Sequence, residues 1–220
     1  QHIGAYQVNI ADGTKEPKYI TFIDTPGHEA FAKMRSRGAT AADIAILVVA
    51  ADDSVKPQTI ESINQIKAAN VHLIVAINKV DLPTANIPKV KQDLARNGVQ
   101  LEGFGGDIPF AQVSAKSGQG VKELLDLILL VWELHGGAPV DLSHLQANVI
   151  ETKIDKGRGL IATVVVKKGT LAYATKLFED DVSIGKVRAL QDEWGKPVKE
   201  ALPGKPVQVL GFDKLPQVGS

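Results

Sequence analysis

Three short polar clusters in the sequence each follow an apolar stretch, and their residue types suit a charged ligand. The first is DTPGHE, which begins at Asp24, the second is NKVD, which begins at Asn78, and the third is SAK, which begins at Ser114. Each apolar stretch has the length of a buried strand, so each cluster is expected just past the end of a strand. The three clusters together form the candidate site of this sequence.

The first cluster offers a carboxylate and a turn without a bulky side chain. Asp24 could hold a magnesium ion, usually through water, because carboxylate oxygens suit this ion. Gly27 lets its backbone N–H approach a terminal phosphate closely, because it has no side chain. Taken alone, Asp-Thr-Pro-Gly is also an ordinary turn sequence, and this cluster by itself does not decide between the two interpretations.

The second and third clusters suit the edge of a guanine base. Asp81 can accept hydrogen bonds from the N1–H and the exocyclic amine of guanine together, a pair of donors that adenine does not offer. Asn78 is short enough to tie neighbouring loops and reach the base edge, and the Lys79 stem could lie along the ring. The N–H of Ala115 could donate to the guanine carbonyl. A single Asn-Lys-x-Asp run is common by chance, whereas three such clusters at strand ends are rare.

Alternating strands and helices would position these clusters. The expected strands are continuous apolar runs, at residues 19–24, 44–51, 71–78 and 109–115. The expected helices follow helical spacing and its stop signals, at residues 58–69, 88–97 and 121–134. The last helix is apolar on almost all sides, so its outer face is expected to be covered too. This order predicts an α/β fold with a doubly wound, mostly parallel sheet, whose ligands bind beyond the carboxyl ends of the strands.

The two ends of the chain depart from this alternation. Residues 5–10 and the run from Tyr19 predict an antiparallel hairpin at the sheet edge. From Val149 onward, short strands separated by glycine and proline turns predict a small all-β barrel. We therefore expect a nucleotide-binding domain over 1–137, a linker over 138–147 and a β-barrel domain over 148–220. The strand register within 172–183 is left open.

Composition narrows the classes of function. The chain has 25 basic and 25 acidic residues, so no net charge draws it to nucleic acid or membrane, and any RNA contact would be local. The absence of cysteine excludes disulfides, thiolate metal sites and a cysteine nucleophile. No apolar run reaches the roughly 18 residues needed to span a bilayer, so we expect no membrane partner.

The motifs DTPGH, NKVD and SAK, taken together, resemble those of the translational GTPases. Within that group, QHIGAYQV and FIDTPGHEAFAKMRSRGATAADIAILVVAADDSVKPQT are similar to bacterial and organellar translation initiation factor two. The resemblance continues through DKGRG, KKGTL, GKVRAL and LGF, so it covers nearly the whole chain. Elongation factor Tu shares the guanine motifs, but the block GHEAFAKMRSRGA separates the initiation factor from it. The resemblance implies a sheet of the P-loop GTPase type followed by the barrel, which is the second domain of the family.

The resemblance also implies a role for individual residues around GTP or GDP and Mg2+. Asp24 would contact the magnesium ion and Gly27 the γ-phosphate, and Thr25 and Pro26 belong to the same nucleotide-binding motif. His28 would be the catalytic residue that positions the attacking water; the alternative is an exposed histidine near the first turn of a helix. The guanine base would be read by the residues of the other two motifs, Asn78, Lys79, Asp81, Ser114, Ala115 and Lys116.

For the whole protein, the resemblance implies an initiation GTPase in the bacterial cytoplasm or, alternatively, the mitochondrial matrix. It would help to place initiator tRNA through domains outside this chain, promote subunit joining and hydrolyse GTP when the large ribosomal subunit activates it. The barrel would contact small-subunit rRNA through basic residues that could equally be a solvated face, namely Lys153, Lys156, Arg158, Lys167, Lys168, Lys186 and Arg188. An elongation-type translational GTPase and a nucleotide-free ribosome-binding module remain alternatives.

One motif of such a protein does not occur in the 220 residues. There is no Gly-x-x-x-x-Gly-Lys-Ser/Thr loop to surround the phosphates, and the first-switch threonine of the family would precede Gln1. Because the chain begins with Gln1 rather than Met, we expect that upstream residues are missing. Losing about five donor contacts of roughly 1.5 kcal/mol each would lower affinity by about five decades. We therefore expect this chain alone to bind GTP feebly and to hydrolyse it hardly at all.

Overall fold

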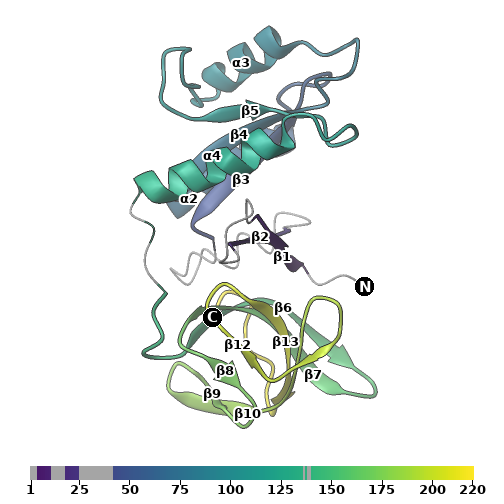
Figure 1. The fold of residues 1–220 in the computed structure, drawn as a ribbon, viewed down its shortest axis with the longest axis vertical. Helices are drawn as coiled ribbons and strands as arrows, with labels where there is room; N and C mark the ends of the chain where they lie inside the picture. The colour runs from purple at the N-terminus through teal and green to yellow at the C-terminus, as the bar shows by residue number, and fades with distance from the viewer. Residues whose placement is uncertain (1–3, 11–17, 25–41, 136, 138–139) are drawn as a thin grey trace. The chain divides into compact units, whose positions relative to one another are not determined.

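The computed structural model describes residues 4–10, 18–24, 42–135, 137 and 140–220. Its internal contacts divide the chain into two compact units. One unit is Ala42–Gly137, and the other combines Gln1–Ala41 with Ala138–Ser220. We call them the sheet unit and the barrel unit, and their elements are labelled in Figure 1.

The sheet unit is built on a parallel sheet of three strands. These are β3 (Ile44–Ala50), β4 (His72–Asn78) and β5 (Phe110–Gln112), in the order β3-β4-β5. The central strand β4 is buried over four successive residues, Ile74 to Ile77. This continuous apolar run is typical of a strand covered on both faces, and it fixes β4 as the core of the unit.

Three helices connect and cover these strands. They are α2 (Pro57–Ala69), α3 (Ile87–Arg96) and α4 (Val121–Leu134), so the predicted helices are confirmed to within one residue at each end. α2 packs against β3, and α4 packs against β4 and β5, as Figure 1 shows for α4 lying across the sheet. None of the helices in the described ranges is long and apolar enough to cross a membrane.

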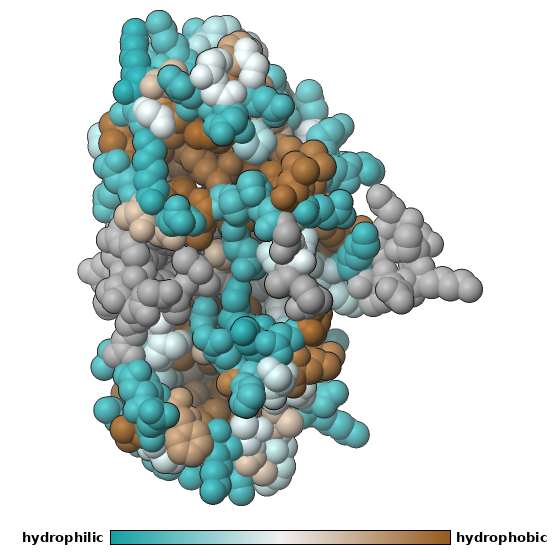
Figure 2. All heavy atoms as spheres, turned by 90° about the vertical axis from the view of Figure 1, so that its left-hand side faces the viewer, coloured by the Kyte–Doolittle hydropathy of each residue, from teal (hydrophilic) through white to brown (hydrophobic). Residues whose placement is uncertain are grey.

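The outer face of α4 differs from its prediction. The helix buries Ile128 and Val131, but Leu130 is 50% exposed and Leu134 is 72% exposed. Figure 2 shows that hydrophobic side chains also reach the surface elsewhere on the chain. The expectation that α4 is covered on both sides is therefore wrong in this structure. An apolar helix sequence does not by itself specify a second element that packs on its outer face.

The barrel unit contains one curved antiparallel sheet and two smaller pairings. Its main strands are β6 (Gln146–Asp155), β7 (Gly159–Lys168), β10 (Val182–Gln191), β11 (Pro197–Val198) and β13 (Pro206–Phe212), in the order β11-β10-β13-β7-β6. β9 (Lys176–Glu179) is the sixth strand of this sheet and pairs with β10, whereas β8 (Leu171–Ala172) and β12 (Glu200–Ala201) form a separate pair. Inward valines and leucines of β7, β10 and β13 form its core, as expected of an all-β barrel.

The register that the sequence left open is set by a tight turn. Glu179 pairs with Val182, so only Asp180 and Asp181 connect β9 to β10. Both connecting residues have positive φ, 48° and 64°, which is the backbone of a type I′ hairpin turn. Gly185 then marks an irregularity in the pairing, so the strand register shifts just after this turn.

The N-terminal strands form a hairpin within the barrel unit. β1 (Ala5–Asn9) and β2 (Tyr19–Ile23) pair antiparallel, from Ala5 with Ile23 to Asn9 with Tyr19. Ala5 is fully buried against barrel residues, and both Gln7 Nε2 and the Thr21 hydroxyl donate hydrogen bonds to the carbonyl of Gly204. These contacts explain why the hairpin belongs to the same compact unit as the barrel.

The pairing of β2 differs from the prediction. The predicted antiparallel pairing with residues 5–10 is confirmed. Residues 19–24 were also expected to be a strand buried in the parallel sheet, but in the described part of the chain β2 pairs with β1 alone, and none of its residues is fully buried. An apolar run indicates a strand without specifying which strand pairs with it. The predicted domain ranges 1–137, 138–147 and 148–220 stay a prediction.

Candidate functional site

The candidate site lies where two neighbouring strands of the sheet unit end. The NKVD turn follows β4 and the SAK turn follows β5, and these strands are adjacent and parallel. Their carboxyl ends therefore meet at one edge of the sheet, which is where ligands of such sheets bind. The backbone also joins the turns, because the N–H of Val80 donates to the carbonyl of Val113 at 3.3 Å.

Asn78 connects the two turns through its side chain. Its Oδ1 accepts one hydrogen bond from the N–H of Lys79 at 2.7 Å and another from the N–H of Ala115 at 3.0 Å. Lys79 needs this support because its φ is 62°, in the left-handed region that a side chain disfavours. One side chain thus holds both turns, although Ala115 is 37 residues from Asn78 in the sequence.

The N–H of Ala115 has a different partner from the one predicted. The sequence assigned this donor to a guanine carbonyl, whereas the structure has it donate to Asn78 Oδ1. A base carbonyl at this position would therefore have to share the donor or displace it. Ala115 therefore lies at the candidate site, and its N–H makes a structural contact with Asn78.

Asp81 presents an ionised carboxylate to solvent. The Ser114 hydroxyl, which donates to it, is the largest cause that holds the pKa of Asp81 below its usual value, and the charge of Lys116 lowers that pKa further. Ser114 is fully buried, and its Oγ also accepts from the N–H of Ser117 at 3.2 Å, so the hydroxyl is held in place. An exposed carboxylate that stays charged is an acceptor for two N–H groups of a base.

A third strand end contributes a residue that the sequence reasoning missed. Asp52 follows β3, and its Oδ2 lies 3.2 Å from Nζ of Lys79. Both side chains are partly exposed, so this ion pair adds little to stability. Its effect is to direct the Lys79 stem. The signal was present in the sequence, because Asp52 follows an apolar run as the other site residues do.

The first predicted cluster is described only at its beginning. Asp24 follows β2, and its N–H donates to the carbonyl of Gly4 at 2.7 Å. The predicted residues Thr25, Pro26, Gly27 and His28 lie outside the described residues. Within the described ranges no three metal-ligating side chains gather, and a single carboxylate such as Asp24 suits an ion held mainly through water.

Two family models match the chain and together account for most of its length. The model of the elongation factor Tu GTP binding domain matches residues 2–133, and the model of elongation factor G domain 2 matches residues 144–220. The chain belongs to the translational GTPase family. Both turns of the candidate site fall within the GTP-binding match.

Known relatives of this translational GTPase are initiation factors. Translation initiation factor IF-2 of Chlorobaculum tepidum is 50% identical over 222 residues, which cover 100% of this chain and 24% of that protein. IF-2 of Nitratiruptor sp. is 52% identical over 219 residues, covering 100% of the chain and 25% of the relative. The chain thus spans about a quarter of the length of the curated relatives it matches. The predicted resemblance to translation initiation factor two is confirmed.

A solved structure supports the fold of this translational GTPase over nearly its whole length. The crystal structure of GDP-bound aIF5B from Aeropyrum pernix superposes with a TM-score of 0.75, at 27% identity, over 99% of this chain and 46% of that one. The predicted fold class, a parallel-sheet domain of the GTPase type followed by an antiparallel barrel, is therefore confirmed.

Proposed function

We propose that the turns after β4 and β5 bind the guanine base of GTP or GDP, and that the whole protein is an initiation GTPase. The observation that carries this proposal is the double hydrogen bond of Asn78, which holds the two turns together at the strand ends. Around it, Asp81 offers a carboxylate whose pKa Ser114 holds below its usual value, and this carboxylate can accept from both N1–H and the exocyclic amine of guanine. Adenine has no such pair of donors.

The remaining side chains of the two turns complete the proposed base site. The Lys79 stem lies along the ring, with its ammonium directed by Asp52. Lys116 adds positive charge beside Asp81 and strengthens its ionised form. The similarity to a GDP-bound relative supports this assignment.

The phosphate end of the site rests on the motif DTPGH. We propose that Asp24 holds Mg2+ through water, that Gly27, which follows Thr25 and Pro26 in the motif, donates its N–H to the γ-phosphate, and that His28 orients the attacking water. When bound, Mg2+ would neutralise charge on the phosphates. Support comes from the family match, which spans this motif.

The partners follow from the relatives named IF-2. We propose that the full-length protein acts on the ribosome in the bacterial cytoplasm, promotes initiator tRNA placement and subunit joining, and hydrolyses GTP when the large subunit activates it. The barrel would contact small-subunit rRNA through its exposed lysines and arginines. Because the 220 residues contain no phosphate-loop motif, we propose that this chain alone binds GTP weakly and is inactive as a GTPase.

The decisive test exchanges one acceptor for a donor in the full-length protein. Asp81→Asn should lower the affinity for fluorescent GDP by at least about a hundredfold and raise that for fluorescent xanthosine diphosphate, because xanthine carries a carbonyl where guanine has its amine. The matched control is Asp126→Asn, an exposed carboxylate that pairs with Lys122 on α4. If Asp81→Asn changes neither affinity, the base site is wrong and the nucleotide-free ribosome-binding module becomes the better interpretation.

A further inference from the structure

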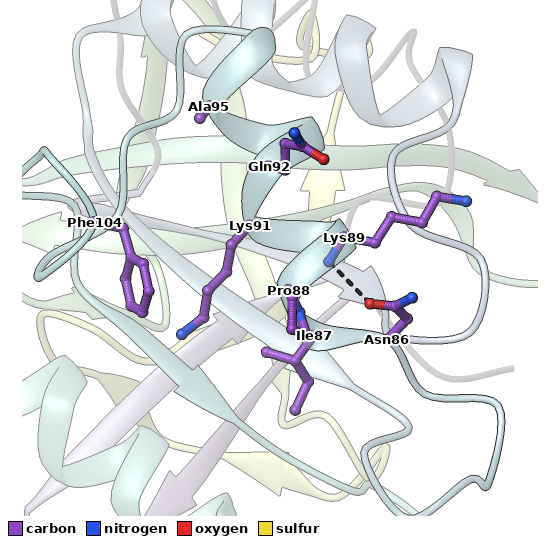
Figure 3. A pocket seen from close by; sticks show the side chains of 8 residues that line it. All are labelled: Asn86, Ile87, Pro88, Lys89, Lys91, Gln92, Ala95 and Phe104. Atoms are coloured by element: carbon purple, nitrogen blue, oxygen red, sulfur yellow. Dashed lines mark hydrogen bonds between the residues drawn. The ribbon is translucent and has the colours of Figure 1, made fainter.

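An open groove of about 740 Å3 lies along α3, and none of the residues that line it belongs to the NKVD or SAK turn. Its wall is formed by the first turns of α3 and by Phe104 of the loop that precedes β5, as Figure 3 shows. In that view Lys91 extends on the side of Phe104 and Lys89 extends on the opposite side, with Ile87 and Pro88 between them. The surface therefore alternates a cation, an apolar strip and a second cation.

Lys91 is held in this groove by aromatic rings. Its Nζ lies 3.6 Å from the ring centre of Phe104 and 4.4 Å from that of Phe110, and the two rings meet edge to face. Such cation–π contacts fix the ammonium without neutralising its charge. Partial burial lowers the pKa of Lys91, which reflects an ammonium that has lost some of its water. An incoming anion would meet a charge that is already partly desolvated.

Phe104 is displayed by a short hydrogen-bonded loop. The ring is 55% exposed, although a phenylalanine usually turns inward. Its N–H donates to the carbonyl of Leu101, and the N–H of Glu102 donates to that of Ile108, so the loop is tied across its base. Gly103 and Gly105, with φ of 75° and 88°, form the bends on either side of Phe104. The aromatic wall is thus built into the backbone of the loop.

Lys89 and Lys91 stand apart from the other basic residues of the sheet unit. Four of the others pair with carboxylates, in Lys56–Asp53, Lys79–Asp52, Arg96–Asp93 and Lys122–Asp126. Lys67 donates to the carbonyl of Asn97, and Lys116 interacts with Asp81. Neither groove lysine has a carboxylate partner within the described part of the chain, and both line the same groove.

We propose that the α3 groove binds an acidic peptide segment of a partner protein. One carboxylate would pair with Lys91 and another with Lys89, and an aliphatic or aromatic side chain between them would cover Ile87 and Pro88. The peptide next to the first carboxylate would contact the ring of Phe104 on the other side of Lys91. A polyanion such as RNA fits less well, because the sheet unit has eleven acidic and only eight basic residues and would repel a long run of phosphates. This inference is independent of nucleotide binding.

The test is a selection of random short peptides displayed on phage, carried out on the full-length protein. We expect the selected sequences to share an acidic, hydrophobic, acidic pattern. Their affinity, measured by fluorescence anisotropy with synthetic copies, should fall about tenfold for Lys91→Gln and about threefold for Lys89→Gln, because each variant removes one ion pair. Phe104→Ala should weaken binding at both low and high salt, whereas the lysine variants should matter mainly at low salt.

Lys122→Gln is the matched control, since it removes an exposed lysine from a different helix of the same unit. Circular dichroism and a thermal melt of each variant separate lost binding from lost folding. Selected peptides without acidic enrichment, or with equal affinity for the wild type and Lys91→Gln, would overturn the proposal. The proposal would also be overturned if an oligouridylate displaced the peptides and bound more tightly with the same dependence on Lys91. Self-association of the protein that Phe104→Ala abolishes would overturn it as well.

Discussion

The NKVD turn of the sheet unit and the DKGRG turn of the barrel unit are both polar turns after a strand, yet they are held in different ways. In the barrel, Asp155 Oδ1 accepts from the N–H groups of Gly157 and Arg158, each at 2.9 Å, and Oδ2 pairs with the Arg158 guanidinium. All these partners are within three residues. In the sheet unit, Asn78 holds Ala115, which is 37 residues away.

The difference separates a turn that its own sequence can specify from a site that needs the sheet. Aspartate accepting from N–H groups two and three residues later is a local motif, which a short peptide can form. The contact from Asn78 to Ala115 exists only when β4 and β5 pair in the observed register, with Ile77 opposite Gln112. We therefore expect changes in the sheet unit to affect stability and ligand binding together, and changes in the barrel turn to remain local.

The largest effect should come from breaking the connection between β5 and α4. A Cβ at Gly120 would lie 2.0 Å from the carbonyl oxygen of Gln112, and its φ is 71°. We expect Gly120→Ala to lower the free energy of unfolding by about 3 kcal/mol or more, measured by urea titration. The control is Gly118→Ala, where φ is 81° but no atom lies within 4 Å, and about 1 kcal/mol is expected. Equal losses would show that the close approach does not constrain the site.

The next effect tests the contact between the two turns. Asn78→Ala would leave the N–H groups of Lys79 and Ala115 without their acceptor. We expect the affinity of the full-length protein for GDP to fall by about ten- to a hundredfold, because both turns lose their common support. Isothermal titration calorimetry measures this directly, with Asn64→Ala on α2 as a control. An unchanged affinity would mean that the turns keep their geometry without Asn78.

A smaller effect is expected where β3 joins the same site. Asp52→Asn removes the ion pair with Lys79 and should weaken GDP binding by only about two- to fivefold, since exposed pairs contribute little. The neighbouring variant Asp53→Asn removes a different pair, with Lys56, and should leave GDP affinity unchanged. Stopped-flow dissociation of fluorescent GDP resolves changes of this size. If both variants act alike, a general loss of negative charge explains the result and the direction of Lys79 does not.

The smallest effect should be confined to the barrel turn and to acid pH. The Arg158 side chain is the main cause that lowers the pKa of Asp155, and the N–H groups of Gly157 and Arg158 add to it. The carboxylate is favoured in the folded state, so its stabilisation is present above the unfolded pKa of about 4 and is lost as the pH falls through the lower folded pKa. Asp155→Asn should therefore flatten the fall of unfolding free energy below about pH 4. The control is Asp213→Asn, which should leave this pH dependence as in the wild type. If Asp155→Asn also shows the wild-type fall of unfolding free energy below about pH 4, the prediction is contradicted.

The sequence by itself determined most of the secondary structure of the sheet unit and the position of its polar clusters, although the strand predicted over 109–115 is shorter, at Phe110–Gln112. Apolar runs and helical spacing predicted β3, β4 and all three helices to within about one residue, because burial of a face leaves its period in the chain. Since NKVD and SAK follow the adjacent parallel strands β4 and β5, the meeting of these two clusters at one sheet edge was also predictable. The barrel was recognisable from short strands and frequent glycines.

Only the tertiary structure decided which groups meet. It directed the N–H of Ala115 to Asn78, brought Asp52 to Lys79 and set the β9–β10 register with the Asp180–Asp181 turn. None of these follows from periodicity, because a periodic pattern specifies the face that is buried and not the partner that covers it. The partner is chosen by hydrogen bonds and packing among segments far apart in the chain, whose relative free energies the local sequence does not contain.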